Sequence, residues 1–187
     1  MPAIKKIVVI GPESTGKSTL CEQLAHVFDT TWCLEYAREY LLEHGMDYSF
    51  EDLLTIAKGQ TRLEDDCLTE LVHRQRADAN KKAHLVFIDT DQWVMKVWSE
   101  FVFGKCDQWI LDQISRRTYD LYLLCCTDLP WVKDPLREYP DLENREKLFH
   151  IYKDIMINQD TPWVEISGNY DQRLSAAVSA VKELVLK

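Results

Sequence analysis

Short runs of consecutive apolar residues alternate along the chain with longer segments in which apolar residues recur every three or four positions. Uninterrupted apolar runs are typical of parallel strands buried on both faces, whereas the three-to-four spacing indicates amphipathic helices. The strand-like runs cover residues 7–10, 31–34, 84–88, 119–126 and 163–166. Five strands separated by helices predict an α/β fold in which helices cover both faces of a five-stranded parallel sheet.

Helix signals mark the segments between these runs. A helix is predicted at residues 36–43, where Gly45 ends it, and Ser49 is the predicted N-cap of a long helix that reaches about residue 79. Further helices are predicted at residues 92–102, 107–117 and 142–158 and from residue 171 onward. Ligands of such sheets bind beyond the carboxyl ends of the strands, so the polar residues that follow each strand are the candidates for a site.

The eight residues after the first strand read Gly-Pro-Glu-Ser-Thr-Gly-Lys-Ser and match the pattern G-x-x-x-x-G-K-[ST] of a phosphate-binding P-loop. The backbone N–H groups of such a loop converge on phosphates at the positive end of the following helix. Lys17 is then predicted to reach the β- and γ-phosphates, and the Ser18 hydroxyl to ligate Mg²⁺. The predicted ATP-binding residues of this loop are Gly11, Glu13, Ser14, Thr15, Gly16, Lys17, Ser18 and Thr19.

Two acidic residues stand at the end of the third strand. Asp89 occupies the position where a carboxylate holds Mg²⁺ opposite Ser18, directly or through water. Asp91 follows two residues later, and either carboxylate is a candidate to accept the proton of an attacking hydroxyl. The alternative for Asp91 is structural, because it is also placed to cap the helix that starts at residue 92.

The loop after the fourth strand contains three prolines and Arg137, and Arg145 lies near the start of the next helix. A mobile loop that carries arginines can close over a triphosphate and stabilise the charge on the phosphoryl group in transfer. Residues 127–145 are therefore the predicted lid, and Arg137 is its predicted catalytic arginine. The alternative for each arginine is a surface ion pair.

Charged and aromatic residues are dense at residues 35–40, after the second strand, where the sequence reads Glu-Tyr-Ala-Arg-Glu-Tyr. Carboxylates can bind ribose hydroxyls, a tyrosine ring can stack on a flat base, and Glu35 and Arg38 share a helix face. The alternative is a solvated helix start with an internal salt bridge. Trp93 and Trp98 are further candidates for stacking on a base, with burial in the core as their alternative.

Composition narrows the class of protein. The 187 residues predict one domain, and no run of eighteen apolar residues is present to span a membrane. No signal peptide precedes the first strand, so we expect a cytoplasmic protein. The net charge of −9 argues against broad nucleic-acid binding. The six cysteines lack metal-ligand spacing and are expected to stay reduced.

Six segments together resemble one known family, the ribosylnicotinamide kinase domain of the NadR-type NAD-biosynthesis proteins and its stand-alone relatives among P-loop kinases. The resemblance extends over nearly the whole chain, in the same order. The segments are Gly-Pro-Glu-Ser-Thr-Gly-Lys-Ser at 11–18, Glu-Tyr-Ala-Arg-Glu-Tyr at 35–40, Ile-Ala-Lys-Gly-Gln at 56–60, Phe-Ile-Asp-Thr-Asp at 87–91, Asp-Leu-Tyr-Leu-Leu at 120–124 and Pro-Trp-Val-Lys-Asp-Pro-Leu-Arg at 130–137.

The resemblance implies a P-loop kinase fold and an ATP·Mg²⁺-dependent kinase that phosphorylates the 5′-hydroxyl of nicotinamide riboside to nicotinamide mononucleotide. It assigns Lys17, Asp89 and Arg137 to catalysis, Ser18 and Asp89 to the metal, and the region of Asn169 to the adenine. The implied acceptor-binding residues are Glu35, Tyr36, Arg38, Gln60 and Asp91. No H-x-G-H nucleotidyl-transfer signature occurs, and DNA-dependent repression is not expected.

Two other functions stay open at the level of the sequence. One is a kinase for another nucleoside or a vitamin-like alcohol. The other is a regulatory P-loop ATPase that acts on a protein partner. A kinase agrees better with the residues, because the chain supplies its own candidate lid arginine and a dense candidate acceptor segment. The sequence does not give the oligomeric state.

Overall fold

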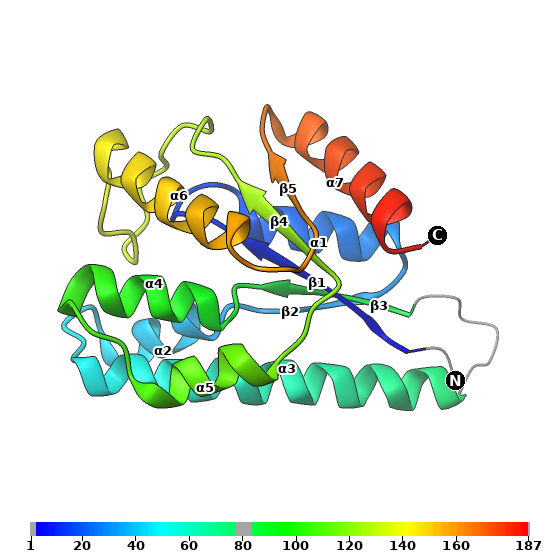
Figure 1. Ribbon diagram of the computed structural model, residues 1–187, viewed down its shortest axis with the longest axis horizontal. Coiled ribbons are helices and arrows are strands. Elements are labelled where there is room, and N and C mark those ends of the chain that lie inside the picture. Colours follow the sequence, from blue (N-terminus) through cyan, green and yellow to red (C-terminus); the bar gives the residue numbers. More distant parts are fainter. Residues whose placement is uncertain (1–2, 78–83, 187) are drawn as a thin grey trace.

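A single parallel sheet runs through the centre of the computed structural model, which describes residues 3–77 and 84–186. Its strands are β1 (Lys5–Ile10), β2 (Thr31–Cys33), β3 (Leu85–Asp89), β4 (Leu121–Cys125) and β5 (Trp163–Ile166). They lie in the order β2-β3-β1-β4-β5, and every neighbouring pair is parallel (Figure 1). The predicted five-stranded parallel α/β fold is confirmed.

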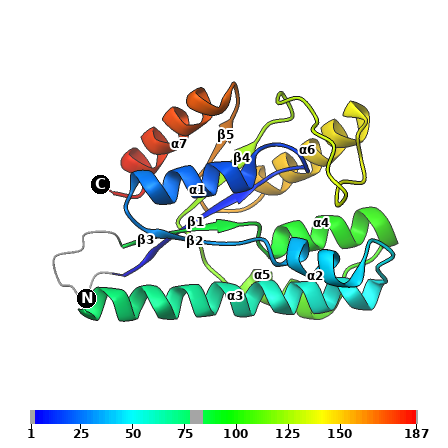
Figure 2. The same ribbon diagram turned by 180° about the vertical axis from the view of Figure 1, so that it is seen from behind.

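Helices cover both faces of this sheet, as Figures 1 and 2 show from opposite sides. Helices α1 (Lys17–Val27) and α7 (Tyr170–Leu184) lie on one face. Helices α3 (Phe50–Ala77), α4 (Gln92–Phe103) and α6 (Leu142–Ile157) lie on the other, and α2 (Tyr36–His44) and α5 (Gln108–Arg116) pack beside α3 and α4.

The alternation of side chains along β1 explains why an uninterrupted apolar run is needed in the central strand. Ile7 and Val9 join the core cluster under α1 and α7, whereas Val8 and Ile10 join the cluster under α3, α4 and α6. All four side chains are completely buried. A polar residue at any of these positions would face one of the two cores, because successive side chains of a strand point to opposite faces.

Helix starts follow the predicted chemistry. The Ser49 hydroxyl accepts the backbone N–H of Asp52 (3.2 Å), and the Asp52 carboxylate accepts the backbone N–H of Ser49 (2.8 Å), so α3 begins with a reciprocal cap. The predicted end of this helix at residue 79 lies outside the described residues. Asn169 and Gln172 form a second reciprocal cap at the start of α7, whereas Asp91 caps α4 by accepting the backbone N–H of Trp93.

The strand predicted at residues 119–126 is shorter at both ends, although backbone hydrogen bonds continue past them: the N–H of Asp120 donates to the carbonyl of Lys6 and that of Cys126 to the carbonyl of Ile166, both at 2.9 Å. Tyr119 precedes β4, and its hydroxyl donates to the buried carboxylate of Glu64 on α3 (2.9 Å).

None of the helices among residues 3–77 and 84–186 combines the length and the apolar character that crossing a membrane requires. The six cysteines are free thiols.

Candidate functional site

The loop between β1 and α1 wraps tightly around the end of β4. Gly11 has a φ of +139°, and a Cβ at this position would lie 2.7 Å from the carbonyl oxygen of Cys125, so a larger residue is excluded by both conformation and space. The Thr15 hydroxyl and the Lys17 ammonium both donate to the carbonyl of Pro12, at 2.8 and 3.0 Å. Two side chains of the loop therefore bind the same carbonyl and hold the loop in its bent form.

Two buried arginines from distant helices hold the same loop from behind, and sequence reasoning missed their role. Arg173 of α7 is 2% exposed and donates to the carbonyls of Gly168 (2.7 Å), Thr15 (3.0 Å) and Cys126 (3.0 Å), and to the carboxylate of Asp128. Arg145 of α6 donates to the carbonyls of Ser14, Thr127 and Leu129, at 3.2 to 3.4 Å. The loop is therefore braced by two cations that water cannot reach.

The predicted metal ligands meet at the start of α1. The Ser18 hydroxyl lies 2.5 Å from Oδ2 of Asp89, and the other carboxylate oxygen of Asp89 is buried without a hydrogen-bond partner among the described residues. Burial, together with the nearby negative charge of Glu35, raises the pKa of Asp89 to about 7. An unpaired carboxylate oxygen beside a hydroxyl is a donor set that suits Mg²⁺.

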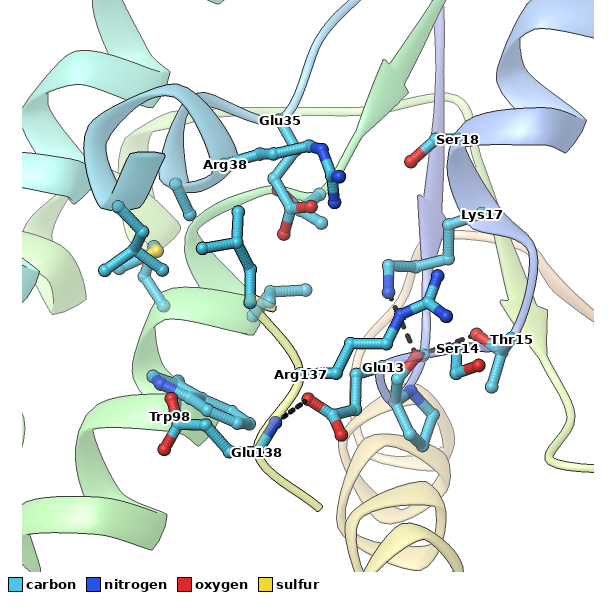
Figure 3. A pocket seen from close by; sticks show the side chains of 18 of the residues that line it. Glu13, Ser14, Thr15, Lys17, Ser18, Glu35, Arg38, Trp98, Arg137 and Glu138 are labelled. Carbon is cyan, nitrogen blue, oxygen red and sulfur yellow. Dashed lines mark hydrogen bonds between the residues drawn. The ribbon is translucent and has the colours of Figure 1, made fainter. Parts of the chain in front are cut away.

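A cavity opens from the P-loop toward α2 and α4 (Figure 3). One end is lined by the P-loop itself, including Lys17 and Ser18. The other end is lined by Glu35 and Arg38, which follow β2, and by apolar residues of α3 and α4, among them Ile56, Met95 and Trp98. Residues of two separate segments of the sequence, 11–18 and 35–38, thus line one continuous cavity.

Some predicted acceptor residues support the cavity wall from behind. Gln60 of α3 accepts the backbone N–H of Tyr36 (2.7 Å) and donates to the carbonyl of Leu34 (3.2 Å), so it fixes the junction of β2 and α2. The Tyr36 ring lies directly over Gly59, where a Cβ would be only 2.0 Å from a ring carbon. Neither Gln60 nor Tyr36 is among the described residues that line the cavity.

Asp91 also lies behind the wall. One carboxylate oxygen accepts the backbone N–H of Trp93 (3.0 Å), and the other accepts the hydroxyl of Tyr122 (2.7 Å). The side chain is 2% exposed, and burial raises its pKa to about 7. Asp91 is absent from the set of described cavity-lining residues, so the structure places it as the helix cap that the sequence offered as its alternative.

Residues 131–139, which we call the strap, cross the mouth of the cavity. Arg137 reaches from the strap into the cavity, as Lys17 does from the P-loop (Figure 3). On the acceptor side Arg38 pairs with Asp134 of the strap (2.9 Å), and Tyr48 donates to the Glu138 carboxylate (2.8 Å). The strap thus connects both ends of the cavity, within the lid region that the prolines predicted.

Two further candidates divide between cavity and core. Trp98 lines the cavity, and its indole N–H donates to the Tyr48 hydroxyl (2.8 Å), whereas Trp93 packs against the core cluster under α3, α4 and α6. Asn169 is exposed and forms a capping box with Gln172 at the start of α7. It lies apart from the described residues that line the cavity.

A strand, a P-loop with its lysine, and a carboxylate at the end of the neighbouring strand define a P-loop nucleotide-binding protein. A family model described as an AAA domain matches residues 6–173. The chain belongs to this AAA domain family.

The chain is also similar to the trifunctional NAD biosynthesis/regulator protein NadR of Salmonella typhimurium and of Escherichia coli. It is 28% identical to each over 187 residues, which covers 97% of this chain and 43% of the relative. A crystal structure of NadR in complex with NR superposes with a TM-score of 0.72 at 25% identity. A second, in complex with NAD and AMP-PNP, gives 0.71 at 23% identity. Each match covers 98% of this chain and 50% of that chain, so the chain spans about half the length of these relatives.

Proposed function

We propose that the chain is an ATP-dependent kinase that phosphorylates the 5′-hydroxyl of nicotinamide riboside to nicotinamide mononucleotide, in NAD salvage. The observation that carries the proposal is the continuous cavity, lined at one end by the P-loop and at the other by a carboxylate, an arginine and an indole. The relationship to NadR along 97% of the chain, and the NadR complexes with NR and with AMP-PNP, support the choice of acceptor and donor. The cytoplasmic location and the lack of nucleic-acid partners stay predictions from the sequence.

Ser18 and Asp89 are the residues that would hold Mg²⁺. When bound, the ion supplies positive charge to the β- and γ-phosphates of ATP. The unpaired oxygen of Asp89 and the Ser18 hydroxyl beside it are both oxygen ligands, the kind that this hard cation prefers. Lys17 and the N–H groups at the start of α1 hold the phosphates, and Arg137 neutralises charge on the phosphoryl group as it moves.

Transfer to the acceptor needs a base for the hydroxyl proton, and the geometry favours Glu35. The acceptor oxygen bonds to the γ-phosphorus, the bond from that phosphorus to the bridging oxygen breaks, and ADP leaves. Glu35 lines the cavity, whereas both oxygens of Asp91 are already bonded and Asp89 faces Ser18. We therefore assign to Glu35 the task of receiving the hydroxyl proton, which the sequence had offered to Asp89 or Asp91.

Replacing Glu35 by glutamine is expected to lower kcat by about a hundredfold or more, because the amide keeps the size of the side chain and loses its basicity. The KM for ATP should change little, since Glu35 lies at the acceptor end. Steady-state kinetics with the Glu39→Gln variant provide the control, because Glu39 is an exposed carboxylate of α2, the helix that begins directly after Glu35, and lies outside the described cavity lining. A kcat within twofold of wild type would remove Glu35 from the role of base.

The function itself is tested by incubating the protein with ATP·Mg²⁺ and a panel of nucleosides and following ADP and product by mass. We expect the mass of a monophosphate with nicotinamide riboside, and little product with adenosine, cytidine or uridine. Product with another nucleoside alone would contradict the assignment of nicotinamide riboside as the acceptor, while the protein would still be a kinase. ADP release that is independent of every acceptor would favour the regulatory ATPase.

A further inference from the structure

The P-loop contains a carboxylate at a position that the phosphate-binding pattern leaves free. Glu13 does not point its charge at the phosphate site but at the strap. Its Oε2 accepts the backbone N–H of Glu138 (3.0 Å), and its Oε1 accepts the backbone N–H of Tyr139 (2.7 Å). The Trp131 indole N–H lies 3.5 Å from Oε1, and the neighbouring Ser14 hydroxyl accepts the backbone N–H of Val132 (3.1 Å).

The negative charge of Glu13 explains why its contacts with the strap matter in a phosphate-binding loop. A carboxylate in a loop that binds a triphosphate repels the ligand, and N–H dipoles that point at the carboxylate offset part of this repulsion. The two consecutive backbone N–H groups of the strap do so, and charge-assisted hydrogen bonds of this kind are stronger than neutral ones. Figure 3 shows the Glu13 carboxylate turned toward the backbone at Glu138. The Glu13 side chain therefore binds the strap, while Glu13 stays among the P-loop residues that line the cavity.

Arg137 lies between two anchored points of the strap. On one side Asp134 accepts the backbone N–H of Leu136 through its carboxylate (3.0 Å) and that of Arg137 through its carbonyl (3.1 Å), while its carboxylate also pairs with Arg38. On the other side the next two N–H groups are held by Glu13. The backbone is thus held on both sides of Arg137, within one residue of the Glu13 contact, and the Arg137 guanidinium itself donates to the carbonyl of Val132 in the same strap.

We propose that Glu13 is a positioning residue, which clasps the strap to the P-loop and so holds the Arg137 guanidinium beside the phosphoryl group in transfer. The proposal rests on the proposed phosphotransfer function, since it assigns Glu13 a task in that reaction. Glu13 itself touches no reacting atom in this scheme and acts through Arg137. Its effect must therefore disappear when Arg137 is absent.

A double-mutant cycle tests this dependence, with ADP formation as the measured rate so that both transfer and acceptor-free hydrolysis are counted. Arg137→Ala is expected to lower kcat by about a hundredfold or more. Glu13→Gln keeps the shape but loses the charge, and is expected to lower kcat by about tenfold or more with a smaller change in the KM for ATP. The double variant should be no slower than Arg137→Ala alone. Independent, multiplying losses would overturn the proposal.

Hydrogen exchange supplies a second readout that does not depend on turnover. The amides of Glu138 and Tyr139 should exchange about tenfold faster in Glu13→Gln than in wild type, whereas Glu22→Gln, which removes an exposed carboxylate of α1, should leave them unchanged. Unchanged exchange in Glu13→Gln would refute the clasp. If the wild-type protein phosphorylates no nucleoside, the proposed function fails, and the exchange data with the hydrolysis cycle still decide for or against the clasp.

Discussion

Replacing Lys17 by alanine is expected to lower phosphoryl transfer by about a thousandfold and to leave the protein folded. The ammonium group lines the cavity beside the loop N–H groups, where a triphosphate places its greatest charge. Its structural role is small: it donates to the carbonyl of Pro12, and that carbonyl keeps a second donor, the Thr15 hydroxyl, when the lysine is removed. The expected loss is therefore one of catalysis and not of stability.

The measurement is kcat together with a thermal unfolding curve for the same preparation. Lys153→Ala is the matched control, because this lysine makes a half-exposed salt bridge to Glu165 on the surface, a kind of pair that contributes little. Its kcat and melting temperature should stay close to wild type. Turnover of Lys17→Ala within tenfold of wild type would contradict the catalytic role of the P-loop.

Replacing Arg173 by methionine is expected to cost about 3 kcal/mol of unfolding free energy. Methionine fills much of the space but donates no hydrogen bond, so the carbonyls of Thr15, Gly168 and Cys126 lose this donor and Asp128 loses its cationic partner. The first of these carbonyls belongs to the P-loop, so affinity for an ATP analogue should fall together with stability.

Urea unfolding measures the first effect, and binding of a fluorescent ATP analogue measures the second. Arg74→Met is the control, since Arg74 makes an exposed pair with Glu70 one helical turn away and should lose less than about 0.5 kcal/mol. Arg173→Lys keeps the charge but lacks the planar guanidinium group. Its loss of unfolding free energy should lie between those of Arg173→Met and Arg74→Met. A loss below 1 kcal/mol in Arg173→Met would show that the loop does not depend on this brace.

The sequence predicted the elements of this fold well because each central strand is buried on both faces and so appears as an unbroken apolar run. It could not predict their order. The runs at β1, β3 and β4 are all apolar, so composition does not distinguish which pair lies side by side. The P-loop was found for a different reason: its glycine, lysine and serine are required by backbone geometry and by phosphate chemistry within one short segment.

The assignment of individual roles was harder, because the same residue type serves two purposes. An aspartate after a strand can bind a ligand or cap the next helix, and at position 91 only the contacts with Tyr122 and the backbone of Trp93 show the cap. Arg145 and Arg173 sit in helices where an arginine signals nothing by itself. Apart from Gly168, the carbonyls that they bind lie more than a dozen residues away in the sequence, which no local pattern encodes.

The buried arginines that contact the P-loop also affect the stage of folding at which the nucleotide site forms. Thr15 and its partner Arg173 are separated by 158 positions, so the loop near the start of the chain takes its final form only after α7 has packed. The conformational entropy of ordering the loop is then lost during folding and not during binding, which favours tight association. During synthesis, we expect nascent chains that lack α7 to bind ATP poorly, so nucleotide affinity reports completion of the fold.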